Sequence, residues 1–267
     1  FFFFKQKTAY EIPKRDWSSD VCSSDLQPRT IRVVAVRRIS IIIPALNEAE
    51  SLPMLLPHPL PSEVAEVILA DGGSSDATRE TAAKLGWKVV RAPRGRAAQM
   101  NAGATAATGE VLLFLHADTR FPGDFARQVA SVLARPGVVA GAFRLAINAP
   151  GFNLRVIEWL ANFRSRVLRM PFGDQAIFVT ADSFRAVGGF PDQPLMEDIE
   201  LIRRLRRRGG IAIASSAVLT SARRWQRLGV WRTTLRNQLC QWAYRCGVSP
   251  ARLHRWYYGA ARDESSS

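Results

Sequence analysis

The sequence predicts an α/β domain with a mostly parallel sheet flanked by helices, followed by a helical extension at the C-terminal end. Three observations predict this fold class. Val111-Leu112-Leu113-Phe114-Leu115 is an apolar run typical of a strand that is buried on both faces. Similar short runs alternate with helical patterns along the chain, as in parallel sheets. Of the 267 residues, 47% are hydrophobic, which is enough to form a full core.

Residues 1–26 do not share this pattern. They show neither helical nor strand periodicity and resemble translated sequencing-adapter sequence, so we expect a non-native or disordered leader. Their four basic and four acidic residues cancel, and the net charge of +14 therefore belongs to the rest of the chain. That charge favours an anionic partner, which is a nucleotide phosphate, an anionic membrane surface or nucleic acid.

Two further features favour a cytoplasmic protein. No apolar run reaches the roughly 18 residues of a membrane span, so we expect no integral membrane segment. Cys240 and Cys246 follow the leader and are expected to be reduced, structural cysteines.

The first expected strand, 39–43, is a β-branched run that ends at Pro44. Asn47 is a candidate N-cap for a helix over 49–56, and the carboxylate of Glu48 suits the positive end of that helix. Capping alone is a sufficient explanation for both residues.

A second strand, 64–70, leads into Asp71-Gly72-Gly73-Ser74-Ser75-Asp76. The two glycines permit a tight turn and the close approach of a ligand. Ser75 or Asp76 is expected to cap a helix that runs to Leu85. Because Asp71 precedes the turn, we expect its carboxylate to accept hydrogen bonds from a ligand and to cap nothing.

A third strand, 87–90, is followed by Arg94-Gly95-Arg96, which opens a helix of small residues. A helix start with two arginines can hold phosphate, although solvated arginines explain the same pattern. The sequence has no G-x-G-x-x-G after the first strand and no G-x-x-x-x-G-K-[ST] loop. A nicotinamide enzyme and a P-loop kinase or ATPase are therefore disfavoured.

The fourth strand, 111–115, brings His116 and Asp118 to its carboxyl end, where open α/β sheets bind ligands. The carboxylate of Asp118 suits a divalent cation that carries a diphosphate. A helix cap is the alternative role for Asp118.

In the second half, we expect strands over 137–145, 176–180 and 211–214, and a helix that opens at Met196-Glu197-Asp198. A helix over 152–169 has one apolar stripe, for which we predict burial as a broad face. The stripe consists of Phe152, Val156, Trp159, Leu160, Phe163 and Val167.

The helix expected over 230–246 carries Trp231, Leu235, Leu239, Trp242 and Cys246 on one stripe. Packing of this stripe against the core or a neighbouring domain is the favoured interpretation. Contact with a membrane surface is the alternative, because tryptophan and arginine reside at the level of lipid headgroups.

Four motifs, taken in order, resemble the inverting glycosyltransferase family two. They are Pro44-x-x-Asn47-Glu48, Asp71-Gly-Gly-Ser-Ser-Asp76-x-Thr78, His116-x-Asp118 and Glu197-Asp198. The segments RGRAAQMN and FLHADT resemble a soluble bacterial subgroup of that family. The resemblance implies the A-type glycosyltransferase fold, with a mostly parallel nucleotide-diphospho-sugar transferase sheet.

This resemblance, together with the basic loop, implies a nucleotide-sugar site. Its residues are Pro44, Asn47, Glu48, Asp71, Arg94, Arg96 and Asp118. Asp71 would bind the base, with uracil favoured, and Asp118 matches the last Asp of the family's metal-binding D-x-D motif. His116 stands where the family commonly has the first Asp, and its imidazole can ligate manganese or contact the sugar or diphosphate. The implied cofactor is Mn2+ or Mg2+.

The resemblance also implies an acceptor side. Asp174 and Gln175, and further along Arg224 and Trp225, would face the sugar or acceptor. Turn formation explains Asp174 equally well, and ordinary packing explains Trp225. An acceptor hydroxyl must lose its proton as it attacks the anomeric carbon, and the family places the catalytic base at Glu197-Asp198. Asp198 is the candidate base and Glu197 is the alternative.

The expected protein is therefore a glycosyltransferase with a catalytic domain over 37–222 and an amphipathic helical extension over 223–260. Its expected donor is a nucleotide-diphosphate sugar, with a UDP-sugar favoured, and nucleic acid is not an expected partner. A lipid-linked acceptor and a peripheral position at the inner face of the plasma membrane are left open. Two alternative functions are a non-catalytic basic module that binds anionic lipid or nucleic acid, and a sugar nucleotidyltransferase. The last is disfavoured because no glycine-rich basic loop follows the first strand.

Overall fold

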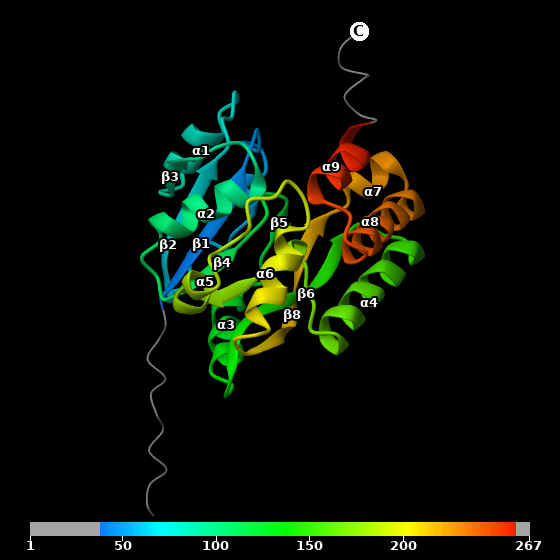
Figure 1. Cartoon of the computed structure of the whole chain (residues 1–267). Coiled ribbons are helices and arrows are strands. Elements are labelled where there is room, and N and C mark those ends of the chain that lie inside the picture. Colours follow the sequence, from blue (N-terminus) through cyan, green and yellow to red (C-terminus); the bar gives the residue numbers. More distant parts are fainter. Residues whose placement is uncertain (1–37, 260–267) are drawn as a thin grey trace, which may run out of the picture. The chain divides into compact units, whose positions relative to one another are not determined.

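The computed structural model describes residues 38–259, and the leader expected over 1–26 lies outside them. The described residues form an eight-stranded sheet in the order β3-β2-β1-β4-β7-β6-β8-β5, flanked by helices (Figure 1). The strands are β1 Ile39–Ala45, β2 Val64–Asp71, β3 Lys88–Arg91, β4 Val111–Phe114, β5 Thr119–Arg120, β6 Val138–Asn148, β7 Phe178–Thr180 and β8 Gly210–Ser221.

The helices are α1 Thr78–Lys84, α2 Arg96–Ala106, α3 Phe125–Leu133, α4 Phe152–Val167, α5 Ala181–Ala186, α6 Glu197–Leu205, α7 Arg223–Leu228, α8 Val230–Arg245 and α9 Pro250–Tyr258, with the short 3-10 helices η1 Leu52–Met54 and η2 Gly173–Gln175. Helices alternate with strands from β2 to β4, as the sequence predicts, whereas α5 and α6, and then α7, α8 and α9, follow one another without a strand between them. Helices α7, α8 and α9 fall within the extension expected over 223–260, whose boundary as a separate unit stays a prediction.

The sheet is parallel in one half and mixed in the other. Strands β3, β2, β1 and β4 run parallel, with Ala45 opposite Asp71 and Ile42 opposite Phe114. Strand β7 is antiparallel to β4 and β6, β6 is parallel to β8, and β5 is antiparallel to β8. The predicted α/β class is confirmed. Because the carboxyl ends of parallel strands meet at one edge, the polar residues that follow β1, β2 and β4 gather there.

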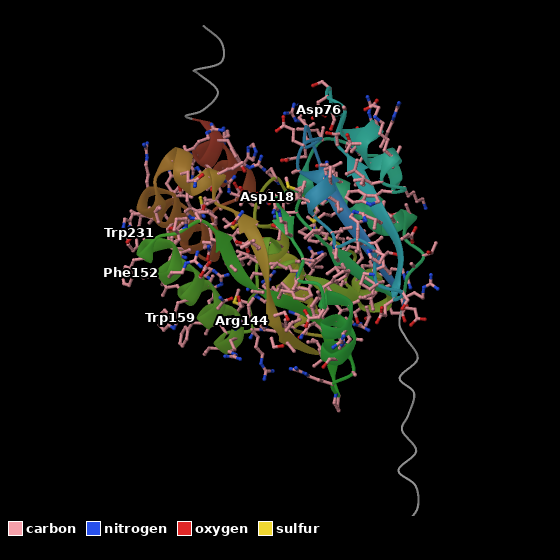
Figure 2. All side chains as sticks on the ribbon, turned by 180° about the vertical axis from the view of Figure 1, so that it is seen from behind. Asp76, Asp118, Arg144, Phe152, Trp159 and Trp231 are labelled. Carbon is pink, nitrogen blue, oxygen red and sulfur yellow. The ribbon has the colours of Figure 1, made fainter. Side chains whose placement is uncertain are left out.

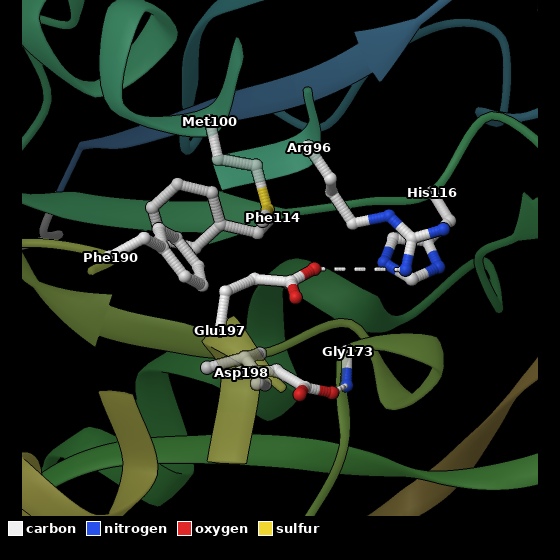
Figure 3. Close-up of a pocket in the computed structure, with 9 residues that line it drawn as sticks. Arg96, Met100, Phe114, His116, Gly173, Phe190, Glu197 and Asp198 are labelled. Carbon is white, nitrogen blue, oxygen red and sulfur yellow. Dashed lines mark hydrogen bonds and ion pairs between the residues drawn. The ribbon is translucent and has the colours of Figure 1, made fainter. Parts of the chain in front are cut away.

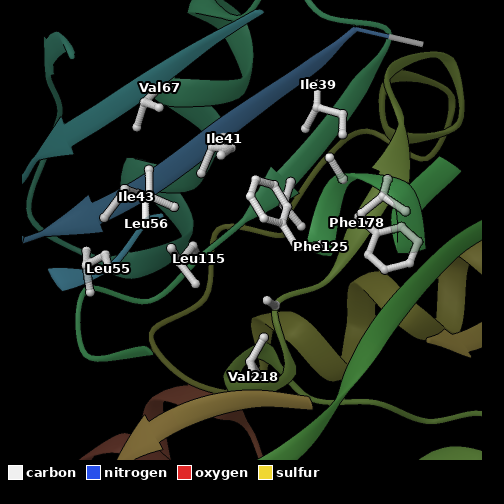
Figure 4. Packing of buried hydrophobic residues seen from close by; sticks show 14 of the residues in the cluster. Ile39, Ile41, Ile43, Leu55, Leu56, Val67, Leu115, Phe125, Phe178 and Val218 are labelled. Atoms are coloured by element: carbon white, nitrogen blue, oxygen red, sulfur yellow. The ribbon is translucent and has the colours of Figure 1, made fainter. Parts of the chain in front are cut away.

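Both faces of the sheet are buried. Side chains alternate along β1, so Ile41 and Ile43 enter a cluster with α3, whereas Ile42 enters a second cluster with α2, α5 and α6. Figure 4 shows the first cluster, in which Phe125 of α3 packs beside the strand residues. Burial on both faces explains why β1 and β4 are nearly continuous apolar runs in the sequence.

The helix predicted over 49–56 is wrong, because only the 3-10 helix η1 forms in this stretch. Asn47 is not an N-cap either. Its φ of 56° is left-handed, and its side-chain oxygen accepts a hydrogen bond from the N–H of Ser75 in the next loop. The segment after β1 is thus organised by the loop after β2 and not by helical hydrogen bonds.

Several strands differ from their predicted bounds, and the differences in β7 and β8 have a clear structural cause. Strand β7 begins only at Phe178, since Ala176 is left-handed with a φ of 48°. Strand β8 extends to Ser221, well beyond the predicted end at 214, because it pairs with β6 along most of its length.

Helix α4 buries the side opposite to the predicted one. Leu154, Ile157 and Ala161 are buried. The predicted stripe is exposed except for the half-buried Val156, with Phe152 at 81% and Trp159 at 63%. On the buried side, Asn162 and Glu158 accept hydrogen bonds from the N–H groups of Leu145 and Ile147 on β6. The helix has two apolar stripes, and these bonds help to fix which one faces the sheet.

The favoured core-packing interpretation of the α8 stripe is also wrong. Trp231, Leu235, Leu239 and Trp242 are between 47% and 63% exposed. Figure 2 shows Trp231 on the same edge of the molecule as Phe152 and Trp159 of α4. Neither helix, nor any other within residues 38–259, has the length and apolar character needed to cross a membrane.

Candidate functional site

An open cleft of about 1060 Å³ lies at the carboxyl ends of β1 and β4. Most of the residues predicted for the site line this cleft, with the exception of Asn47, Asp71 and Gln175. Those that line it are Pro44, Glu48, Arg94, Arg96, His116, Asp118, Asp174, Glu197, Asp198, Arg224 and Trp225. Figure 3 shows an adjoining small pocket, where four of these residues meet an apolar wall of Met100, Phe114 and Phe190.

The loops after β1 and β2 are bonded to each other. The N–H of Asn47 donates to Ser74 Oγ over 3.0 Å, and Asn47 Oδ1 accepts from the N–H of Ser75 over 2.9 Å. The N–H of Glu48 donates to Thr78 Oγ1 over 2.9 Å. Asn47 therefore positions the loop that carries Pro44 and Glu48 and does not itself line the cleft.

Asp71 is 1% exposed and does not cap α1, whose N-cap is Ala77. Its carboxylate accepts hydrogen bonds from the N–H groups of Gly73, over 3.3 Å, and Ser74, over 3.0 Å. Gln99 fixes the same region, since its side-chain amide donates to the carbonyl oxygens of Ala45 and Ala70. Both side chains hold the ends of β1 and β2 in place.

Arg96 and Glu197 face each other across the cleft from the first turns of α2 and α6. Arg96 Nη1 lies 3.8 Å from Glu197 Oε1. Burial raises the pKa of Glu197 to about 7, the neighbouring Asp198 carboxylate also raises it, and Arg96 opposes both effects. Burial thus favours the protonated form of Glu197.

Asp198 is held by backbone donors. Its Oδ2 accepts from the N–H of Gly173 over 2.7 Å, and its Oδ1 accepts from the N–H of Ile199 over 2.8 Å. A Cβ at Gly173 would lie 3.0 Å from His116 Nε2 and 3.4 Å from Asp198 Oδ2. The absent side chain at Gly173 therefore allows His116 and Asp198 to approach the same backbone.

His116 is a neutral base in this site. Burial lowers its pKa well below the ordinary value, and the positive charges of Arg96 and Arg224 lower it further. A neutral imidazole keeps one lone pair for a metal ion or a hydrogen-bond donor. Asp118, two residues along, accepts a hydrogen bond from the Thr119 hydroxyl over 3.2 Å.

Asp174 lines the cleft from η2. Burial raises its pKa to about 6, Arg164 opposes this rise, and the carboxylates of Asp198 and Asp118 add to it. Its Oδ1 is buried and has no hydrogen-bond partner within the part of the chain that the structure describes. A ligand that donates a hydrogen bond would satisfy this atom. The positive charge of Arg164, a residue that the sequence did not single out, lowers the pKa of Asp174.

Gln175 does not face the cleft, in contrast to the prediction. It is fully buried, its Nε2 donates to the carbonyl of Phe143 over 3.0 Å, and its Oε1 accepts from Ser165 Oγ over 2.6 Å. Gln175 thus ties η2 to β6 and α4, which fixes the position of Asp174. The sequence could not separate these neighbours, because both follow the same turn signal.

The acceptor side contains Arg224 and Trp225, together with residues that sequence reasoning missed. The guanidinium of Arg224 lies 5.6 Å from the centroid of the Tyr257 ring. The missed residues come from α8, α9 and the residue after α9; they include Asn237, Gln241, His254, Tyr257 and Tyr258. The run Trp256-Tyr257-Tyr258 was the available signal, since adjacent aromatic residues with hydroxyl groups are well suited to polar ligands.

Comparison with known proteins gives a family match and two partial relatives. Residues 40–187 match the family described as Glycosyl transferase family 2. An uncharacterized glycosyltransferase of Mycobacterium tuberculosis is 33% identical over 108 residues, which are 40% of this chain and 49% of the relative. An undecaprenyl-phosphate 4-deoxy-4-formamido-L-arabinose transferase of Yersinia enterocolitica is 29% identical over 122 residues, 41% of this chain and 37% of that protein. The chain thus spans about half the length of the mycobacterial relative and less of the other.

Solved structures share the fold. Glucosyl-3-phosphoglycerate synthase from Mycobacterium tuberculosis, in complex with Mn2+, UDP and glucosyl-3-phosphoglycerate, has a TM-score of 0.56 at 21% identity and covers 79% of this chain and 81% of its own. S. aureus TarS in complex with UDP-GlcNAc has a TM-score of 0.53 at 16% identity, and the match covers 69% of this chain and 58% of the TarS chain. These likenesses confirm the predicted A-type glycosyltransferase fold.

The family match extends over more than half of the chain and includes the segments after β1, β3 and β4 that line the cleft. The chain therefore belongs to glycosyl transferase family 2.

Proposed function

We propose that this chain transfers a sugar from a nucleotide-diphosphate sugar, with a UDP-sugar favoured, to an acceptor hydroxyl with inversion at the anomeric carbon. The cleft carries the proposal, because it sets the cationic first turn of α2 against the acidic first turn of α6 at the ligand-binding edge of the sheet. Family membership supports glycosyl transfer, and the UDP named for the two solved structures supports the nucleotide.

The donor would lie along the β1, β2 and α2 side of the cleft. Arg94 and Arg96 flank the N-terminus of α2, where guanidinium groups and backbone N–H groups favour a diphosphate. Pro44 and Glu48 would line the nucleoside pocket. Asp71 stays a candidate for binding the nucleobase. A carboxylate group has about four lone-pair sites, and the hydrogen bonds from the turn use two of them.

A divalent cation, Mn2+ or Mg2+, fits this donor set as an ion shared with the substrate. Within residues 38–259, no group of three His, Cys, Asp or Glu side chains is arranged to hold a metal ion, so His116 and Asp118 would form an incomplete pair. Such ions fill their coordination with phosphate oxygens and water. When bound, the ion would neutralise charge on the leaving diphosphate.

The acceptor hydroxyl oxygen would attack the anomeric carbon from the face opposite the diphosphate. The new C–O bond forms as the bond to the phosphate oxygen breaks, and the diphosphate leaves with that electron pair. The hydroxyl proton passes to a carboxylate, with Asp198 as the proposed base and Glu197 as the alternative. Asp174, Arg224 and Trp225 would orient the acceptor, and a lipid-linked acceptor is the candidate considered below.

A thermal-shift panel tests the donor site. The full chain is heated with UDP, GDP, CDP or TDP, each with and without Mn2+, because a ligand that binds only the folded form raises the melting temperature. We expect a shift with UDP that Mn2+ enlarges and that Asp118→Ala abolishes. Asp182→Ala, which removes an exposed carboxylate of α5 outside the cleft, is the matched control and should retain the shift.

The same panel contains the results that would overturn the proposal. If no nucleotide raises the melting temperature of the folded wild-type chain, the donor site is absent. The non-catalytic basic module then becomes the better interpretation. If UDP raises the melting temperature equally with and without Mn2+, the shared metal ion is removed from the proposal. His116 is then the group proposed to contact the diphosphate.

A further inference from the structure

The outer sides of α4 and α8 carry the largest concentration of exposed apolar side chains that the structure describes. We call this set the α4–α8 surface, and each member is between 46% and 81% exposed. Its members are Phe152, Trp159, Leu160, Phe163, Val167 and Leu168 at α4, and Trp231, Leu235, Leu239 and Trp242 at α8. Soluble domains rarely expose contiguous apolar patches unless another surface covers them.

This apolar surface is not needed to hold α4 on the sheet. Helix α4 already buries Leu154, Ile157 and Ala161 on its opposite side. On the outer side, the rings of Trp159 and Phe163 stack with their centroids 5.5 Å apart. The outer stripe is therefore a second apolar face, ordered without a covering partner in the described chain.

The two helices present their outer stripes together. They lie side by side in Figure 1, and Figure 2 places Phe152, Trp159 and Trp231 along one edge. Near their N-terminal ends, Val230 of α8 packs against the cluster that contains Leu154 and Ile157. Near their C-terminal ends, Arg245 of α8 contacts the Met170 sulfur beyond α4. Each helix has 16 residues and is about 24 Å long, so the pair forms a broad platform.

Charge around the platform identifies its partner. Residues 223–259 contain eight arginines and no aspartate or glutamate, and residues 152–170 contain four arginines and one glutamate. That one acid, Glu158, pairs with Arg155 over 3.0 Å. An apolar face in an arginine-rich part of the chain complements an anionic bilayer, in which apolar side chains enter the acyl boundary and guanidinium groups remain with the headgroups. A second copy would bring arginines against arginines.

We propose that the α4–α8 surface docks the protein peripherally on anionic phospholipid bilayers, with both helices parallel to the membrane plane. Trp159, Trp231 and Trp242 enter the interfacial region, where indole rings are favoured. The other side of α8 supplies Asn237, Cys240 and Gln241 to the cleft. Docking therefore keeps the acceptor side of the cleft close to the lipid, and in this respect alone it deepens the proposed function by favouring a lipid-carried acceptor.

Vesicle co-sedimentation tests the proposal without any sugar transfer. The full chain is mixed with vesicles of equimolar phosphatidylcholine and phosphatidylglycerol, and separately with phosphatidylcholine alone. We expect binding to the anionic vesicles and a loss of at least about tenfold in the double variant Trp159→Glu/Trp231→Glu. Met54→Glu is the matched control, since Met54 is 52% exposed on η1, outside both helices, and this variant should bind like the wild type.

Three results would overturn the inference: no binding of the wild type to anionic vesicles, unchanged binding of the double variant, or equal loss in the control. Sedimentation equilibrium measures whether the wild type is a dimer. If it is a dimer that does not bind vesicles, and if the double variant is a monomer, the α4–α8 surface is instead a contact between two copies of the chain. Circular dichroism confirms that each variant is folded. Since nucleotide binding is measured separately by thermal shift, failure of docking and failure of the donor site give distinguishable results.

Discussion

The carboxylate of Asp198 accepts a hydrogen bond from the backbone N–H of Gly173 over 2.7 Å, which joins the first turn of α6 to η2. The bond fixes the direction of the carboxylate while its residue lines the cleft. A general base needs such a fixed direction toward the hydroxyl whose proton it takes. This contact and related ones are the basis of four testable predictions.

Asp198→Asn should lower the rate of sugar transfer by about 10²–10⁴-fold, the usual contribution of a positioned general base. The amide oxygen of asparagine can still accept from Gly173 N–H, so UDP binding and folding should be preserved. The rate is measured as nucleoside diphosphate released from the donor. Glu197→Gln is the companion variant, and a larger loss there than in Asp198→Asn would transfer the role of base to Glu197.

Gly173→Ala should reduce the transfer rate without unfolding the chain. The new Cβ would lie 3.0 Å from His116 Nε2 and 3.4 Å from Asp198 Oδ2, so one of these groups must move by a few tenths of an ångström. Displacements of this kind in an active site are costly because catalysis depends on alignment. Gly123→Ala is the control, since a Cβ there meets no atom within 4 Å. Equal activity of the two variants would contradict the assigned geometry.

The burial of Glu197 should make folding stability fall as pH rises. Its pKa is about 7 in the folded chain against an ordinary value of 4.5, so between these values the unfolded chain has released a proton that the folded chain retains. Stability therefore decreases through this window. Glu197→Gln removes the effect, and its melting temperature relative to wild type should be higher at pH 8 than at pH 5 in metal-free buffer. Glu110→Gln, at an exposed site, should show no such trend.

Gly103→Ala should destabilise the fold by about 1–3 kcal/mol, the usual effect of overpacking. Gly103 on α2 is buried, and a Cβ there would collide with Ile42 Cγ2 of β1. This loss should exceed the gain of about 1 kcal/mol expected for replacing glycine by alanine in a helix. Denaturant unfolding measures the difference, with Thr105→Ala at an exposed position of the same helix as control. A more stable Gly103→Ala variant would show that β1 and α2 can separate.

Close packing of α2 on β1 could not be predicted from the sequence. Arg94-Gly95-Arg96 predicted a basic entry to a helix of small residues, which concerns phosphate binding and not the packing of that helix. Contact between Gly103 and Ile42 depends on residues more than fifty positions apart, and local pattern carries no information about such a pair. The same limit applies to Gln99, which lies in a recognised motif but supports the ends of β1 and β2.

The placement of the cleft, by contrast, was predictable. Strands β1 and β4 are buried on both faces, so they require continuous apolar runs that end abruptly at polar residues. In a parallel sheet, those ends must lie at one edge, which brings the loops with Glu48 and Asp118 together. The sequence by itself therefore determined the fold class, the ligand-binding edge and eleven of the residues around the cleft.

Only the tertiary structure decided which side of a helix or turn meets the core. Helix α4 has apolar stripes on opposite sides, and both satisfy the helical period. The choice depends on Asn162 and Glu158, which bond to the backbone of β6 and turn the other stripe outward. Asp174 and Gln175 were separated in the same way, by the partners that Gln175 finds on β6 and α4. Periodicity specifies a face, whereas burial is a property of the surface that the face meets.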